Sequence, residues 1–468
     1  SFAQSNGTVY WDKAGIISVL PLNSSQLESL SLWTQFREQV RHPALPGEIQ
    51  AVLDVKSEER SADQQAMLRK HFFEQVHPSF STSFEQPIAN RASLNQQLAG
   101  LEKSIPATLV MEDLQEPRQA HVLERGEYTL QREKVDSQTP EWILPRDESS
   151  PANRLGLAQW LVNPKHPLTA RVTVNRYWQH FFGTGLVKTS EDFGIQGEYP
   201  SHPELLDWLA IDFITSGWNT KRMHKQIVMS MTYQQSSHFG PDKLAVDPEN
   251  RLLARGPSYR LDAEVIRDQA LSVSGLLVGT IGGKSVRPYQ PAGLWKPVGF
   301  GGSNTSVFKQ DDGPNLYRRS MYTFWKRTAP PPSMSTFDAP DRETCQVRRA
   351  RTNTPLQALV LMNDVQFVEA AREFAVRVLT EGGDDVDTRL IFAFRTATSR
   401  RPTDTEIHRL KQLLTEYQAI FKKSPEAAKA IISNGDSKPN GDVDPTELSA
   451  WTIITHLLLN LSETVTKA

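Results

Sequence analysis

Basic side chains gather in one part of this sequence, between Tyr317 and Arg351. Eight cationic residues stand there against three carboxylates, which gives the segment a local net charge of +5. The cationic residues are Arg318, Arg319, Lys326, Arg327, Arg342, Arg348, Arg349 and Arg351. Guanidinium groups pair bidentately with carboxylate, sulfate and phosphate oxygens, so a segment of this density can bind such an anion. The alternative, which is the more common one in loop-rich domains, is that these arginines hold loops together through internal carboxylates and carbonyl groups.

The three carboxylates of this segment belong to Asp338, Asp341 and Glu343. Glycoside hydrolysis needs two carboxyl groups about 5 to 10 Å apart, which makes Asp338 and Asp341 the candidate acids. The nearby Trp295 and Trp325 can supply a platform on which a sugar stacks, although large aromatic residues more often belong to a core. Carboxylates this close together in a loop also more often cap helices or pair with arginine. The pattern therefore assigns no catalytic residue.

The chain has one cysteine, Cys345, so it can form neither an internal disulfide nor a CxxCH haem attachment. Flanking arginines can activate a thiol, but an unpaired cysteine is more often a small buried apolar residue. The histidines considered as metal ligands are His121, His180, His202 and His224. They are scattered without ligand spacing, and His180 is better interpreted as an interior hydrogen-bonding residue. We expect no metal site and no cofactor in this chain.

Length and composition exclude several classes of protein. The 468 residues include 52 Lys and Arg against 54 Asp and Glu, so a net charge of −2 gives no global field that favours nucleic acid. Apolar residues make up 38% of the chain, which argues against wholesale disorder. No apolar run approaches the roughly 18 residues that cross a bilayer, so we expect no membrane span.

The elements that must position these residues are mostly helices. Apolar residues recur at helical spacing, with matching caps and turn residues, over most of the chain. The predicted helices cover 24–43, 46–55, 60–76, 79–104, 153–161, 170–182, 203–215, 221–233, 261–278, 355–380, 385–398, 403–423 and 446–462. Strands are predicted at 8–20, as a pair at Thr108–Met111 and Ala120–Leu123, and at Ser320–Trp325. The fold class is therefore mainly α-helical with small β elements, a bundle-like module with a loop-rich insertion at 284–345.

Several long motifs are specific enough to indicate a family. They are NRLGLAQWLV from Asn153, LTARVTVNR from Leu168, EDFG from Glu191, PSHPELLDWL from Pro200, YRRS from Tyr317, FWKRT from Phe324, FDAPDR from Phe337 and RTNTPLQAL from Arg351. Together they resemble the PSD1 module (DUF1553) of large planctomycete cytochrome c proteins. The resemblance runs from about residue 153 to the carboxyl end.

The resemblance implies three parts: strands left from a concanavalin-like sandwich at 1–22, a helical linker with an extended connector at 23–151, and the PSD1-like module at 152–468. It implies an extracytoplasmic location, in periplasm or cell envelope, and haem c on the N-terminal part of a precursor or on a separate cytochrome. The expected function is then a non-catalytic structural and assembly module that supports electron transfer by this haem-bearing partner, and an oligomer is expected. The alternative is a protein that binds or degrades anionic polysaccharide with the Arg, Asp and aromatic residues of 318–351.

Overall fold

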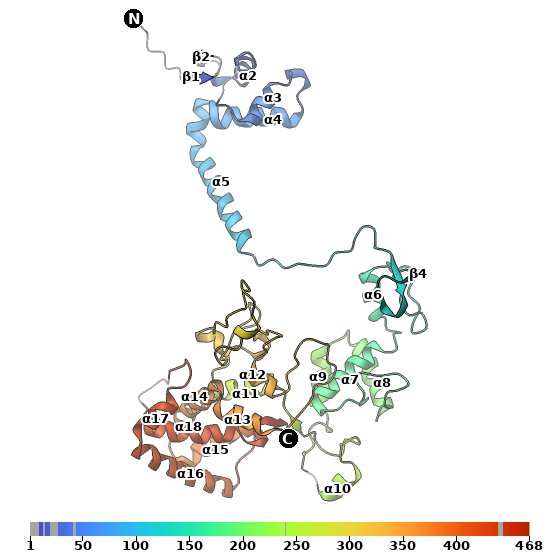
Figure 1. Ribbon diagram of the computed structural model, residues 1–468, viewed down its shortest axis with the longest axis vertical. Helices are drawn as coiled ribbons and strands as arrows, with labels where there is room; N and C mark the ends of the chain where they lie inside the picture. Colours follow the sequence, from blue (N-terminus) through green and yellow to red (C-terminus); the bar gives the residue numbers. More distant parts are fainter. Residues whose placement is uncertain are drawn as a thin grey trace. The chain divides into compact units, whose positions relative to one another are not determined.

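The structure is a computed structural model that describes residues 9–12, 15–18, 27–40, 44–238, 240–438 and 443–467. Its contacts divide the chain into two units, Ser1–Arg118 and Gln119–Ala468 (Figure 1). Each unit has its own hydrophobic core.

The first unit is helical around one small core. Strands β1 (Val9–Asp12) and β2 (Gly15–Ser18) form an antiparallel pair, as predicted. The helical elements are α2 (Leu30–Gln39), α3 (Gly47–Leu53), η1 (Ser57–Glu59), α4 (Ala62–His71), η2 (Phe72–Val76) and α5 (Pro78–Ser104). Serines cap two of them, since Ser29 accepts a bond from the Leu32 amide and Ser61 forms a capping box with Gln64. The core contains Trp33, Ile49, Val52, Leu53, Leu68 and Phe72.

The second unit opens with a hairpin and a helical subcluster. The hairpin pairs β3 (Ala120–Leu123) with β4 (Gln131–Val135), with the 3₁₀ turn η3 (Glu124–Gly126) between them. The helices are α6 (Arg154–Leu161), α7 (Thr169–Phe182), α8 (Pro203–Thr215), α9 (Thr220–Val228) and α10 (Pro241–Val246). Helices α7, α8 and α9 share a core that includes Val174, Trp178, Leu206, Phe213 and Ile227. Inside it, the fully buried Asn175 bonds both the amide and the carbonyl of Val187, which ties α7 to the following loop.

The carboxyl-terminal part is a helical bundle centred on α14 (Val365–Glu381) and α18 (Pro445–Leu459), which lie among the other red and orange helices in Figure 1. The alanines Ala370, Ala371 and Ala375 have no exposed surface, and small residues of this kind let neighbouring helices approach closely. The remaining elements are β5 (Tyr259–Arg260), α11 (Ala263–Ser274), η4 (Lys296–Val298), η5 (Gly313–Tyr317), η6 (Ser320–Tyr322), α12 (Pro332–Thr336), α13 (Pro355–Asn363), α15 (Val386–Thr398), α16 (Asp404–Lys423), α17 (Pro425–Ile432), α19 (Ser462–Val465) and β6 (Thr466–Lys467). Strand β6 pairs with β5, so the end of the chain returns to the start of α11.

The mainly helical fold with small β elements is confirmed, and the sheets are two-stranded throughout the described residues. Two strand predictions are wrong. Thr108–Met111 forms no strand: Leu109, Val110 and Met111 are almost fully exposed, and β3 pairs with β4 instead. Ser320–Trp325 begins with the 3₁₀ turn η6, because both the amide and the hydroxyl of Ser320 are bound by Asp268. The rest of the segment pairs with the chain at Val286 through a single isolated bridge at Thr323, and not through a ladder.

Candidate functional site: an arginine-lined cleft

A basic concavity of the second unit is a cleft of about 620 Å³. It lies between α7 and the irregular segment 340–351. Five guanidinium groups line it, those of Arg176, Arg342, Arg348, Arg349 and Arg351. The lining carboxylates are those of Asp262 and Glu343, so the charges of the lining sum to a positive value. The cleft thus gathers four members of the sequence-predicted arginine cluster, Arg342, Arg348, Arg349 and Arg351, with one further arginine, Arg176.

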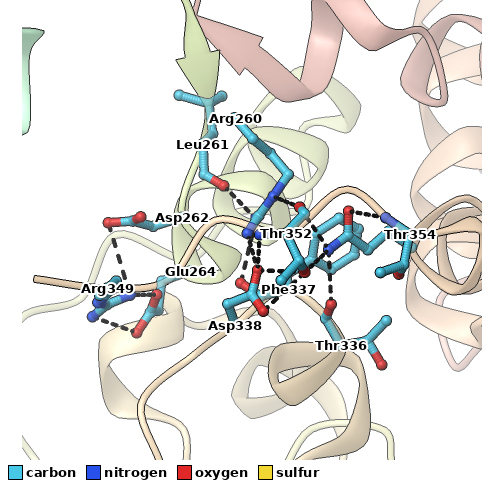
Figure 2. A network of polar contacts seen from close by, with 11 residues as sticks. Arg260, Leu261, Asp262, Glu264, Thr336, Phe337, Asp338, Arg349, Thr352 and Thr354 are labelled. Carbon is cyan, nitrogen blue, oxygen red and sulfur yellow. Dashed lines mark hydrogen bonds and ion pairs between the residues drawn. The ribbon is translucent and has the colours of Figure 1, made fainter. Parts of the chain in front are cut away.

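A partly buried polar network fixes the start of the cleft-forming segment (Figure 2). Asp338, which adopts a left-handed φ of 59°, accepts a charge-assisted bond from Arg260. Its carboxylate also accepts the backbone amide of Thr352 at 2.8 Å and the Thr352 hydroxyl at 2.9 Å. Gln357 then donates to the carbonyl of Thr352 at 3.2 Å. Both ends of the loop 338–352 are therefore held by one carboxylate, which is a positioning role for Asp338 and not a free acid.

Arg349 is held against α11 by a bidentate ion pair. Its guanidinium donates to the two Glu264 carboxylate oxygens at 2.6 and 3.2 Å, with Asp262 at 3.8 Å (Figure 2). Burial alone would raise the pKa of Glu264, but the hydrogen bonds and charge of Arg349 outweigh burial and hold this pKa below its ordinary value. Arg349 therefore lines the cleft, and its positive charge is neutralised by the ion pair with Glu264.

Arg351 closes the carboxyl end of α7. Its guanidinium donates to the Gly183 carbonyl at 3.1 Å and lies 4.3 Å from the centre of the Tyr259 ring. The Tyr259 hydroxyl donates to the His180 carbonyl at 2.5 Å, and burial raises the pKa of Tyr259 to about 12. A cation at the carboxyl end of a helix meets unpaired carbonyls and the negative end of the helix dipole, so these contacts stabilise α7.

The three other arginines that line the cleft are less firmly held than Arg349 and Arg351. Arg342 lies 4.6 Å from the centre of the Trp325 ring, and Arg348 pairs with Glu191 at 3.2 Å across the surface. Arg176 is exposed and makes no ion pair within the described part of the chain. Stacking leaves the guanidinium edge of Arg342 able to donate, and an exposed pair such as Arg348–Glu191 is weak enough to exchange partners. Arg176, Arg342 and Arg348 are thus the groups available to an incoming oxyanion.

His180 also lines the cleft, one helical turn after Arg176. Desolvation lowers its pKa, and Arg349, Arg176 and Arg351 lower it further against the opposing charge of Asp262. His180 is therefore neutral at pH 7. Its side chain is exposed, so the interpretation as an interior hydrogen-bonding residue is wrong. Cys345 is likewise exposed and lines the cleft, so the expectation of a buried apolar cysteine is also wrong.

The other residues of the predicted cluster lie outside the lining of the cleft. Arg318 is buried and donates to the carbonyls of Thr280, Gly282 and Lys284. Arg319 lies 3.8 Å from Asp268, and Arg327 pairs with Glu343 at 3.4 Å on the surface.

The second candidate acid, Asp341, also has a local use. Its carboxylate accepts the Glu343 amide at 2.9 Å, and its carbonyl accepts the Trp325 indole. The structure therefore does not gather Asp338 and Asp341 as an acid pair in the lining of this cleft.

Sequence reasoning missed Arg176, Arg260 and Glu264 as parts of this site. Arg176 had a usable signal, because it precedes His180 by four residues and so shares its helix face. Arg260 and Glu264 had none, since their partners Asp338 and Arg349 lie 78 and 85 residues further along the chain.

Metal binding and membrane crossing are two further properties on which the described residues bear. No group of three or more His, Cys, Asp and Glu side chains there is arranged to hold a metal ion. Nor does any described helix combine the length and apolar character that crossing a membrane requires.

Comparison with known proteins gives a family. The family model PSD1, described as a protein of unknown function (DUF1553), matches residues 153–414, from the N-cap of α6 into α16. No curated protein and no solved structure matches the chain. The match covers more than half of the sequence and includes both walls of the arginine-lined cleft, and on this ground the chain belongs to the PSD1 (DUF1553) family.

Proposed function

We propose that this chain is a non-catalytic structural and assembly module of an extracytoplasmic, planctomycete cytochrome c-associated complex. Haem c would reside on the N-terminal part of the same precursor or on a separate cytochrome, and this chain would support electron transfer by holding that partner. Membership of the PSD1 family supports the proposal, because the sequence motifs resemble modules found in such cytochromes.

The observation that carries the non-catalytic part is the internal use of the charged residues. Asp338 is bound by Arg260 and Thr352, and Arg318 is bound by three carbonyl groups. A general acid or base needs a carboxyl group that can reach substrate and change protonation state. A carboxylate that already accepts bonds from a guanidinium, an amide and a hydroxyl is instead a structural anchor.

An exposed apolar face supports the assembly part. Trp208 and Ile211 lie one turn apart on α8, and 55% and 60% of their surfaces are exposed. Exposed tryptophan beside aliphatic surface is typical of interface anchors. We infer that this face of α8 contributes to the contact with the haem-bearing partner.

Purification of the complex from its native source, without denaturant, tests the proposal. We expect a polypeptide with the visible absorption of c-type haem to co-purify in fixed stoichiometry with this chain. Trp208→Ser should reduce the recovered haem absorbance at least tenfold, because truncation of a central interface tryptophan costs about 2 kcal/mol or more. The control is Trp142→Ser, which changes a tryptophan outside α8 that is more exposed than Trp208, at 85%. Equal losses in the two variants, or none in either, would contradict a role for α8.

A second function, binding of anionic polysaccharide, is favoured by one specific observation: Arg176 and Arg342 face the cleft without a carboxylate partner among the described residues. Sulfate and carboxylate groups on a glycan can pair with such guanidinium forks, and Trp325 lies beside Arg342. The internal use of Asp338 favours binding over degradation.

Calorimetric titration of a sulfated oligosaccharide and its desulfated form tests this second function. We expect only the sulfated form to bind, more weakly at higher salt, and Arg176→Gln with Arg342→Gln to lower affinity at least tenfold. Arg409→Gln on α16 is the charge-matched control and should bind as the unmodified chain does. Equal binding of both sugars, or equal loss in the control, would exclude an arginine-based site.

A further inference from the structure

The first unit, which lies outside the family match, contains its own concavity. A pocket of about 710 Å³ is formed by α2, α3, α4 and η2. Among the residues lining it are Trp33 and Arg37, which stand one helical turn apart on the same face of α2.

Arg37 is a buried cation that has no counter-ion among the described residues. Only 8% of its surface is exposed, and its Nε and Nη1 atoms have no hydrogen-bond partner in the part of the chain that the structure describes. The same unit shows how a buried arginine is normally satisfied: Arg60 donates to the carbonyls of Val52 and Leu53 and to the carboxylate of Glu38. A guanidinium does not deprotonate at any physiological pH, so Arg37 cannot relieve its burial by losing its charge.

A second donor beside Arg37 is also unsatisfied. The indole Nε1 of Trp33 has no acceptor within the described ranges of the first unit, and Trp33 has no exposed surface. Both residues carry donors only, so what complements them is a group that accepts hydrogen bonds and carries negative charge. A carboxylate has both properties, and each of its oxygens can accept a bond.

The remaining lining limits what the carboxylate can be attached to. About half of its residues are aliphatic, with Leu45, Ile49, Met67 and Val76 among them. Its charged residues besides Arg37 are Glu48, Glu74 and Lys70, and Glu74 is engaged by Arg91 at 2.9 Å. Two acidic neighbours disfavour a dianion such as phosphate, whereas an aliphatic wall favours an apolar body.

We propose that this pocket binds a monoanionic organic carboxylate with an aliphatic chain. The carboxylate would sit on Arg37 and the Trp33 indole, with the chain along the aliphatic lining. Because Trp33 has no exposed surface, binding requires a shift of the side chains that cover its indole edge. The site is independent of the arginine-lined cleft and of the proposed assembly function.

Calorimetric titration of the full chain with octanoate, 1-octanol and inorganic phosphate tests the proposal. We expect octanoate to bind at least about tenfold more tightly than octanol, the usual gain from charge-assisted hydrogen bonds, and phosphate not to bind. Arg37→Met should abolish the preference for octanoate over octanol. Trp33→Phe, which removes only the indole donor and keeps an aromatic ring, should weaken octanoate binding several-fold.

Arg176→Gln in the second unit is the control and should leave octanoate binding unchanged. Without ligand, Arg37→Met should be at least as stable as the unmodified chain, because it replaces an unpaired buried charge by an apolar side chain of similar length. Equal affinity for octanoate and octanol would overturn the proposal. So would an octanoate preference that survives Arg37→Met or depends on Arg176, and so would a large loss of stability in Arg37→Met.

Discussion

Replacing Asp338 by Asn is the sharpest test of how the cleft-forming loop is held. Asparagine has the same shape and also tolerates the left-handed φ of 59°, so the substitution creates neither a cavity nor new backbone strain. It removes the charge that faces Arg260 and places an amide donor in that neighbourhood. The two side chains are only 17% and 12% exposed, so Arg260 is left as a largely buried cation.

The expected cost is about 2 to 3 kcal/mol in the free energy of unfolding of the second unit. Breaking a fully buried pair costs about 3 to 5 kcal/mol, and the residual exposure of this pair reduces that figure. Denaturant unfolding gives the free energy, and hydrogen exchange at the Thr352 amide, which Asp338 accepts at 2.8 Å, gives the local effect. We expect faster exchange at Thr352 together with weaker oxyanion binding.

The matched control is Glu343→Gln. Its partner Arg327 lies 3.4 Å away, but these side chains are 52% and 62% exposed, so we expect a change within about 0.5 kcal/mol. In the double variant with Arg260→Met, the total loss should be smaller than the sum of the single losses, because no unpaired charge remains. If Asp338→Asn cost no more than Glu343→Gln, the network would not be what holds the loop.

Two further predictions concern stability. Hydrogen bonds from Arg400 lower the pKa of Glu406 to about 2 from 4.5, so this carboxylate stabilises the fold fully above pH 4.5 and loses its contribution as pH falls toward 2. Glu406→Gln should flatten the acid limb of the stability profile by at most about 1 kcal/mol, since both partners are partly exposed, and an unchanged limb would contradict this. Gly435→Ala should lower the free energy of unfolding by about 2 kcal/mol or more, because φ is +88° and an added Cβ would lie 2.2 Å from the Glu369 carboxyl carbon. If denaturant unfolding shows no change, the turn at Gly435 is not fixed against α14.

The helices were predictable from local information, and the exceptions have physical causes. The predicted helix 355–380 is two helices, because the Asp364 side chain accepts from the Gln366 amide and starts α14 directly after α13 ends. The β-branched and aromatic residues at 320–325 suggested a strand, yet Phe324 packs toward Trp295 in the core. The residue types at 320–325 indicate burial, and they do not by themselves indicate strand pairing.

For the arginine-lined cleft, the sequence predicts only that many arginines occur close together along the chain. The sequence does not show which of them face solvent, because each choice depends on a partner far along the chain. Arg318 is bound by carbonyl groups 34 to 38 residues earlier, and Arg348 meets Glu191 157 residues earlier. That Arg37 is buried without a hydrogen-bond partner for its Nε and Nη1 atoms among the described residues is likewise visible only once α2, α3 and α4 are folded together.

The central claim is that this chain assembles with a haem-bearing partner. The most direct test is the mass and visible spectrum of the particle purified from its native source without denaturant. The assembly account predicts a complex heavier than one 52.7 kDa chain, with c-type haem absorption in constant ratio to this polypeptide. A colourless, homogeneous 52.7 kDa species would contradict it.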